Sequence, residues 1–274
     1  MKMKIQKITI ALLLAIAVIF TSCESWIDTE INIDPDSPSD VPLAMLLPSI
    51  QANIAYDLCG NDAVMPTNIW MQYFNGYARQ AQIYARYLFT PADVNNLWDG
   101  IYAGAGMDLK VLMDKAAEAE APHSAGIAEI TMAYMMAITT DLYGDIPYSE
   151  AFLGTANLTP AVDDQQSVYA AIDGLLTSAI AHLGEIDLVG ISGDMMHGGD
   201  ADAWVKTAYA LKARNAINLS ERNGAAAYTA ALAAVGNAYE SNADNLAFVF
   251  GVGTSEQSPL SQFVDQRGDI VMGS

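Results

Sequence analysis

The segment IAEITMAYMMAITTDLYGDIPY, residues 127–148, decides the fold of this chain. Its apolar side chains fall on one stripe at spacings of three and four, namely Ile127, Ile130, Tyr134 and Ile138. This spacing predicts a helix near Ile127 to Asp141. The composition then changes abruptly to tyrosines and acids around Gly144 and Pro147. That second part is either a functional loop or a joint between helices.

Each residue of this second part has a structural task if it forms a joint. We expect Asp141 to Tyr143 to end the helix, and Gly144 to adopt a positive φ as its C-cap. Pro147 would then prevent the helix from resuming. Tyr143 and Tyr148 would anchor the crossing chain against the neighbouring helices, with their hydroxyls hydrogen-bonded. We therefore interpret this run as a joint and do not expect the ligand to bind there.

The same periodicity predicts helices along most of the chain. The further helical stretches are residues 93–116, 167–183, 203–221 and 225–239. We expect the first of these to be broken or kinked at its glycines, and Asp202 to be the N-cap of the helix at 203–221. A strand signal is present only in NLAFVFGVG, residues 245–253.

Neighbouring helices are expected to form antiparallel pairs. The helix near 127–141 would pair with 167–183, and 203–221 would pair with 225–239. Bulky and small residues alternate within these pairs in a way that loosely resembles tetratricopeptide repeats. The sequence thus predicts a mainly all-α fold, in which tetratricopeptide-like helix pairs form an α-superhelical scaffold with irregular loops and little strand.

The N-terminus carries an export signal. Basic residues precede an apolar run from Ile8 to Phe20, which is shorter than the roughly twenty residues that cross a bilayer. Thr21 and Ser22 then stand before Cys23, as in a bacterial lipobox. We predict a lipoprotein signal peptide at 1–22 and acylation of Cys23; the alternative is plain secretion with Cys23 incidental. Residues 23–42 are acidic and contain prolines, which predicts an extended tether.

Composition restricts the partners of the chain. Its formal net charge is −20, and removal of the signal peptide takes away three Lys but no acid. Such a chain would be repelled by nucleic acid and by anionic membrane surfaces. With Cys23 acylated, Cys59 would have no partner for an intrachain disulfide, so the fold must depend on its hydrophobic core.

Candidate catalytic and metal-binding residues are few. No standard enzyme signature is present, and His123 and His182 suit structural roles. His197, Asp200 and Asp202 lie within six residues, which leaves a metal site conceivable, although capping by Asp202 is the stronger interpretation. Carboxylate pairs such as Asp163 with Asp164, or Asp145 with Glu150, could hydrolyse a glycosidic bond, but so acidic a chain offers many such pairs by chance.

Residues 70–89, WMQYFNGYARQAQIYARYLF, are the candidate ligand-binding segment. This segment holds nine aromatic or Arg residues. Aromatic faces stack on sugar rings or peptide side chains, and Arg, Gln and Asn donate hydrogen bonds to hydroxyls and carbonyls. The candidate ligand-binding residues are Trp70, Tyr73, Tyr77, Arg79, Tyr84 and Arg86. The alternative is that Trp70, Phe74 and Tyr77 face the core.

Several segments together resemble the SusD/RagB nutrient-binding lipoproteins of the Bacteroidetes outer membrane. They occur in one consistent order: Cys23 followed by INIDPDSPSDVP, LWDGIYAGAGMDLKVLMDKA at 97–116, DLYGDIPY at 141–148, and GD before AWVKTAYALKARNAI at 199–217. Tyr209 stands where the family usually has Asn. The structural signature of the family is carried here by Asp141, Tyr143, Gly144, Pro147, Tyr148 and Trp204.

The resemblance implies a surface-exposed, lipid-anchored outer-membrane protein that captures oligosaccharides for a SusC-like TonB-dependent transporter. It implies binding without cleavage, no metal and no cofactor, over a helical domain at 43–274. Family members are usually longer, so we expect the C-terminal part of the binding region to be missing. The alternatives are a peptide-binding RagB-type member, a tetratricopeptide-like scaffold for a protein partner, and a secreted glycan hydrolase.

Overall fold

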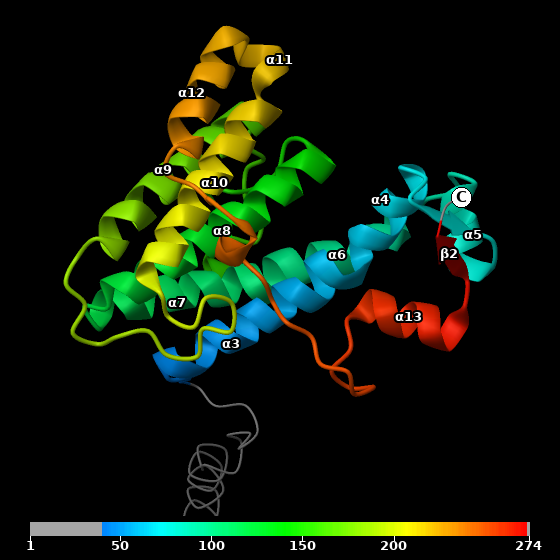
Figure 1. Cartoon of the computed structure of the whole chain (residues 1–274), viewed down its shortest axis with the longest axis horizontal. Coiled ribbons are helices and arrows are strands. Elements are labelled where there is room, and N and C mark those ends of the chain that lie inside the picture. The colour runs from blue at the N-terminus through cyan, green and yellow to red at the C-terminus, as the bar shows by residue number, and fades with distance from the viewer. Residues whose placement is uncertain (1–39, 273–274) are drawn as a thin grey trace, which may run out of the picture. The chain divides into compact units, whose positions relative to one another are not determined.

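The computed structural model describes residues 40–272 (Figure 1). The chain divides into two units, Met1–Val41 and Pro42–Ser274. The predicted signal peptide, Cys23 and most of the tether lie outside the described residues. Within 40–272, no helix has the length and apolar character that a bilayer span requires.

The second unit is mainly helical, as predicted. Its α-helices are α3 (Leu43–Asn53), α4 (Val64–Trp70), α5 (Arg79–Ala85), α6 (Asn95–Asp99), α7 (Gly106–Glu118), α8 (Pro122–Tyr143), α9 (Gln165–Leu183), α10 (Ala201–Asn218), α11 (Ser220–Asn223), α12 (Ala225–Val235) and α13 (Pro259–Arg267). The π-helical turns are η2 (Ile54–Asp62) and η4 (Gly100–Ala105), and the 3₁₀ turns are η3 (Pro91–Val94), η5 (Gly154–Ala156) and η6 (Asn242–Asp244). The two short strands are β1 (Phe74–Gly76) and β2 (Ile270–Met272).

Helices α8 and α9 form the first predicted pair. Their antiparallel direction follows from side-chain contacts, because Glu129 near the start of α8 accepts hydrogen bonds near the end of α9, from Ser178 at 2.8 Å and from His182 at 2.9 Å. At the other end, the hydroxyl of Tyr169 donates to Asp141. Helix α8 is buried over most of its length, so it is the central element of the core.

Helices α10 and α12 form the second predicted pair, and α10 also packs on α9. The buried side chains of α12 are all alanines, Ala227, Ala231 and Ala234, which let the backbones approach closely. Lys212 of α10 donates to Asp173 of α9 at 2.5 Å. The predicted pairing of both helix hairpins is therefore confirmed.

The predicted break within 93–116 is also present. The chain passes from α6 through η4 into α7, and Gly104 has φ −98° and ψ −111°, outside the helical region. Gly106 is required by packing, since a Cβ there would lie 2.3 Å from the ring of Phe152.

The backbone at the end of α8 has the geometry that the sequence predicts. Gly144 has φ +78° and ψ −118°, and its N–H donates to the carbonyl of Thr140 at 2.9 Å. Tyr143 packs its ring edge-on against Trp98, with centroids 5.1 Å apart. The carboxylate of Asp163 accepts the backbone N–H groups of Tyr148 and Ser149 at 2.8 and 2.7 Å. Asp163 thus stabilises the joint.

Two predictions about local structure are wrong. Residues 245–253 form no strand, because no neighbouring chain within 40–272 pairs with them. The N-cap of α10 is Asp200, whose side chain accepts the N–H of Ala203 at 3.1 Å. Asp202 lies in the first turn instead, where its charge favours the positive end of the helix dipole.

We expect Gly144→Ala to lower the free energy of unfolding by about 1–3 kcal/mol, because a Cβ is strained at this φ and ψ. The matched control is Gly174→Ala, at an exposed site within α9 with open space at the Cβ. This substitution should raise the free energy of unfolding by about 0.5–1 kcal/mol. Urea denaturation measures both. A selective loss of ligand binding in Gly144→Ala, without loss of stability, would contradict the role of this segment as a joint.

Candidate ligand-binding site

The candidate segment 70–89 folds as a helix, a short strand and a second helix: the end of α4, then β1, then α5. Strand β1 pairs with β2 in an antiparallel register, and this sheet joins the segment to the chain after α13. The paired residues are Phe74 with Met272, Asn75 with Val271, and Gly76 with Ile270. The segment is therefore supported by residues from the far end of the described chain.

A small hydrophobic core lies beneath this segment. Its buried members are Met65, Ile69, Ala81, Tyr84 and Ile270, and Trp70, Phe74, Phe89, Leu260 and Phe263 pack against them. Gly76 permits close packing, since a Cβ there would lie 2.2 Å from the carbonyl oxygen of Ala81. The indole N–H of Trp70 donates to the carbonyl of Tyr84 at 3.0 Å, which fixes the plane of the ring.

Arg79 forms the main polar contact between the two ends of this assembly. Its Nε and Nη2 atoms donate to both carboxylate oxygens of Asp269, at 2.6 to 3.0 Å, and Nη2 also donates to the carbonyl of Arg267. The Asp269 side chain is 2% exposed, whereas that of Arg79 is 60% exposed. The hydrogen bonds from Arg79 lower the pKa of Asp269. Tyr77 adds a hydroxyl hydrogen bond to the carbonyl of Gly268.

A pocket of about 340 Å³ opens beside this core. Its lining residues are Ile69, Trp70, Gln72, Phe74, Asn75, Ala85 and Tyr87, which together we call the aromatic pocket. The rings of Trp70 and Tyr87 are nearly parallel, with an interplanar angle of 15° and centroids 6.3 Å apart. Gln72 and Asn75 contribute amide donors and acceptors. Flat rings beside amide groups are suited to binding a sugar ring or a planar side chain.

Backbone strain is concentrated in the same segment. Among residues 40–272, the non-glycine residues with positive φ are Gln72, Arg79, Tyr87, Glu120 and Phe152, of which the first three lie within 70–89. Each such residue costs about 1–3 kcal/mol and persists only where its surroundings hold it in place. Gln72 and Tyr87 both line the aromatic pocket, so the strain there positions lining residues.

The predicted ligand-binding residues are not all at this pocket. Trp70 lines it, and Tyr84 lies in the core below with 3% exposure. Tyr77 and Arg79 contact residues 267–269, while Tyr73 and Arg86 are exposed outside the pocket lining. Their roles in ligand binding remain predictions.

Phe74 and Tyr87 are the aromatic lining residues that the sequence-based set omits. Tyr87 is 68% exposed, and its signal in the sequence was only its place in the aromatic-rich segment.

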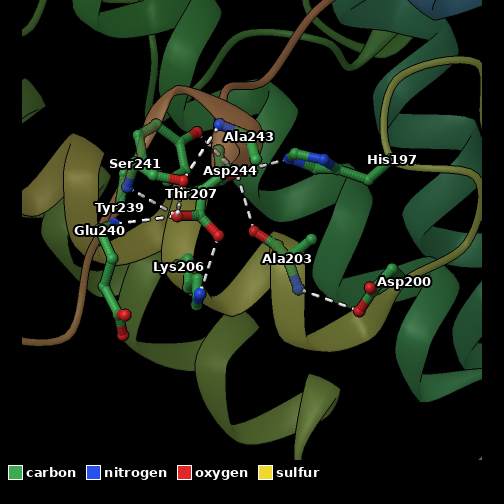
Figure 2. A network of polar contacts seen from close by, with 10 residues as sticks. All are labelled: His197, Asp200, Ala203, Lys206, Thr207, Tyr239, Glu240, Ser241, Ala243 and Asp244. Carbon is green, nitrogen blue, oxygen red and sulfur yellow. Dashed lines mark hydrogen bonds and ion pairs between the residues drawn. The ribbon is translucent and has the colours of Figure 1, made fainter.

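The segment around His197, considered above for metal binding, is occupied by structural contacts (Figure 2). The Nε2 atom of His197 lies 2.9 Å from the hydroxyl of Thr207, which in turn contacts that of Tyr239. Burial lowers the pKa of His197, despite the neighbouring carboxylates. Within 40–272, no group of three or more His, Cys, Asp or Glu side chains is placed to hold a metal ion.

The same figure shows how the chain after α12 is attached to α10. Lys206 donates to Asp244 at 2.8 Å, and Asp244 accepts the backbone N–H groups of Glu240 and Ser241, each at 2.9 Å (Figure 2). The hydrogen bond from Lys206, assisted by these two N–H groups, lowers the pKa of Asp244 to about 2.

Comparison with known proteins decides the family. A SusD-like family model, described as starch-binding and associating with the outer membrane, matches residues 35–274. The chain belongs to this SusD-like family. The resemblance to the SusD/RagB family that the sequence indicates is therefore confirmed. A search of curated proteins gives no match.

Solved SusD-like structures share the fold. A SusD/RagB family protein from Bacteroides thetaiotaomicron is 28% identical, with a TM-score of 0.78 over 85% of this chain and 50% of its own. A SusD homolog from Bacteroides uniformis is 25% identical, with a TM-score of 0.66 over 82% of this chain and 50% of its own. A chitin-binding SusD homolog from Flavobacterium johnsoniae is 23% identical, with a TM-score of 0.67 over 84% and 47%. The chain spans about half the length of these structures.

We expect Asp269→Asn to lower the melting temperature at neutral pH, because Arg79 loses its charged partner. The folded-state pKa of Asp269 is lowered, so its contribution is fully present above the ordinary carboxyl pKa of about 3.9 and is lost as the pH falls through the folded-state pKa. The difference in melting temperature between wild type and variant should therefore disappear in acid. Thermal melts from pH 7 downward measure it, with the exposed Asp265→Asn as control. A difference that stays constant with pH would contradict the ion pair.

Proposed function

We propose that this SusD-like protein binds oligosaccharides at the cell surface and delivers them to a SusC-like TonB-dependent transporter, without cleaving them. The observation that carries the proposal is the aromatic pocket, in which two nearly parallel rings lie beside two amide side chains on a SusD-like fold. Starch and chitin fragments are the first ligands to test, because the family is described as starch-binding and one similar structure as chitin-binding.

Binding at this pocket requires no titrating group. The indole of Trp70 is fixed by its hydrogen bond to Tyr84, and Tyr87 is fixed by its backbone conformation and by its contact with Trp70. A preformed stacking surface loses little conformational entropy when a sugar binds. The carboxylates of Asp163 and Asp164 both have structural roles, since Asp163 stabilises the joint after α8 and Asp164 caps α9. These roles favour a binding protein over a hydrolase that uses this pair.

We propose that the chain is anchored to the outer membrane by lipid on Cys23. The family description associates these proteins with the outer membrane, and the apolar run before Cys23 has the length of a signal peptide. The acidic tether would then hold the helical unit away from the bilayer.

We expect Tyr87→Ala to weaken oligosaccharide binding about two- to twelvefold, because one aromatic contact contributes about 0.5–1.5 kcal/mol. Isothermal titration calorimetry with malto- and chito-oligosaccharides measures the affinity. Tyr228→Ala, which removes a half-exposed tyrosine from α12, is the matched control and should bind as wild type does. Shortening of the oligosaccharide during the titration, or no binding of either series, would contradict the proposal.

We expect Cys23→Ser to abolish incorporation of a palmitate label when the full chain is expressed in a host with lipoprotein export. Cys59→Ser is the matched control and should keep the label, because Cys59 lies within η2, where its thiol contacts the hydroxyl of Tyr134 at 3.1 Å. A labelled Cys23→Ser protein would exclude this anchor.

A further inference from the structure

Residues 245–253 run without regular secondary structure between η6 and α13, as the orange coil in Figure 1. Their burial nevertheless alternates. Leu246, Phe248 and Phe250 are half-buried, whereas Ala247 and Val249 are exposed, Val249 by 82%. An alternation with a period of two is typical of a strand with one face on a core.

The inward face is packed in place. Phe248 and Phe250 contact each other edge-on with centroids 5.1 Å apart, and Tyr56 of η2 contacts Phe250 at 5.2 Å. Leu246, Phe248 and Phe250 cover a cavity of about 210 Å³ above α8 and η2. The segment is therefore held against the helices by its side chains and not by its backbone.

The backbone of residues 246–250 has no hydrogen-bond partner within residues 40–272. The flanking bonds run from the N–H of Asn245 to Asn242 at 3.4 Å and from the N–H of Gly251 to Glu256 at 2.9 Å. Between them, no N–H donates to a protein acceptor, and no carbonyl accepts from a protein donor. This is the hydrogen-bonding state of an open strand edge.

Both ends of the segment are fixed. At its start, Asp244 binds Lys206 and the backbone of residues 240 and 241 (Figure 2). At its end, Gln262 of α13 donates to the carbonyl of Thr254 at 2.6 Å. A segment whose two ends and inward side chains are already fixed loses little conformational entropy when a partner pairs with it.

The negative charge around the segment favours a partner with basic residues. No Lys, Arg or His occurs from Asn223 to Gln266, whereas Glu240 and Glu256 flank the segment. The charge of Asp244 is already paired with Lys206. Glu256 lies directly at its end, since a Cβ on Gly251 would be 2.2 Å from a carboxylate oxygen of Glu256. A second copy of this acidic chain would be repelled, and a segment with basic ends would be attracted.

We propose that residues 246–250 bind an extended peptide with basic flanks by β-augmentation. Another extended backbone presents N–H and C=O groups in the alternation that this edge requires, and its uncharged side chains would lie beside Ala247 and Val249. This site is separate from the aromatic pocket and does not depend on the proposed function.

The probe is a fluorescent, capped Lys-Val-Thr-Val-Thr-Val-Lys peptide, titrated into the full chain by fluorescence anisotropy. We expect saturable binding, at least about tenfold weaker when the internal amides are N-methylated, because the backbone hydrogen bonds are lost. Glu256→Gln should weaken binding about two- to fivefold, and Asp265→Asn should leave it unchanged. Hydrogen exchange at residues 246–250 should slow when the peptide is saturating.

Three results would overturn the proposal: no binding of the parent peptide, equal binding of its N-methylated form, or binding that leaves exchange at residues 246–250 unchanged. The circular dichroism spectrum of each variant checks that a loss of affinity is not a loss of fold.

Discussion

The contact between Arg79 and Asp269 joins residues 190 positions apart, and the candidate site depends on it. A guanidinium matches both oxygens of a carboxylate at once, so this contact fixes orientation as well as distance. With the pairing of β1 and β2, it holds Ile270 in the small core beneath Trp70 and Phe74. The shape of the aromatic pocket therefore depends on a segment that contributes none of its lining residues.

Two residues that line the pocket also lower the local stability of the fold. Gln72 and Tyr87 adopt backbone conformations that cost free energy, and Tyr87 is largely exposed. The surrounding contacts compensate, because the indole of Trp70 is hydrogen-bonded and Gly76 permits close packing on α5. Strain that the surroundings hold in place is characteristic of functional sites, which is why we propose ligand binding here and not at the conformationally relaxed helix pairs.

The helical scaffold could be predicted from the sequence because its determinants are local. The stripe from Ile127 to Ile138 defines α8, Gly144 ends it, and the glycines after Asp99 break the next helix. The long-range contacts could not be predicted in this way. Asp194 is an example: it accepts hydrogen bonds from Gln51, 143 positions away, and from the indole of Trp204, and thereby holds the loop before α10.

The candidate site could be predicted only in part, for the same reason. The aromatic and Arg content of residues 70–89 indicated the segment that supplies the lining of the aromatic pocket, but no local pattern distinguishes Tyr84 in the core from Tyr87 at the pocket. That difference depends on Ile270 and α13, far along the chain, and on the left-handed backbone at Tyr87. Residues 246–250 are the opposite case. Their alternating pattern is found again in their burial, but no strand forms because no partner strand is present within 40–272.

The central claim is that oligosaccharides bind at the aromatic pocket. The most direct measurement is a titration of the ¹⁵N-labelled full chain with chito- or malto-oligosaccharides, observed at the side-chain amides and indoles by NMR. Binding at the pocket predicts saturable chemical-shift changes for the side-chain amides of Gln72 and Asn75 and for the indole N–H of Trp70. The chemical shift of the side-chain amide of Asn237, in the turn after α12, should not change. Shifts confined to residues outside the pocket would contradict the claim.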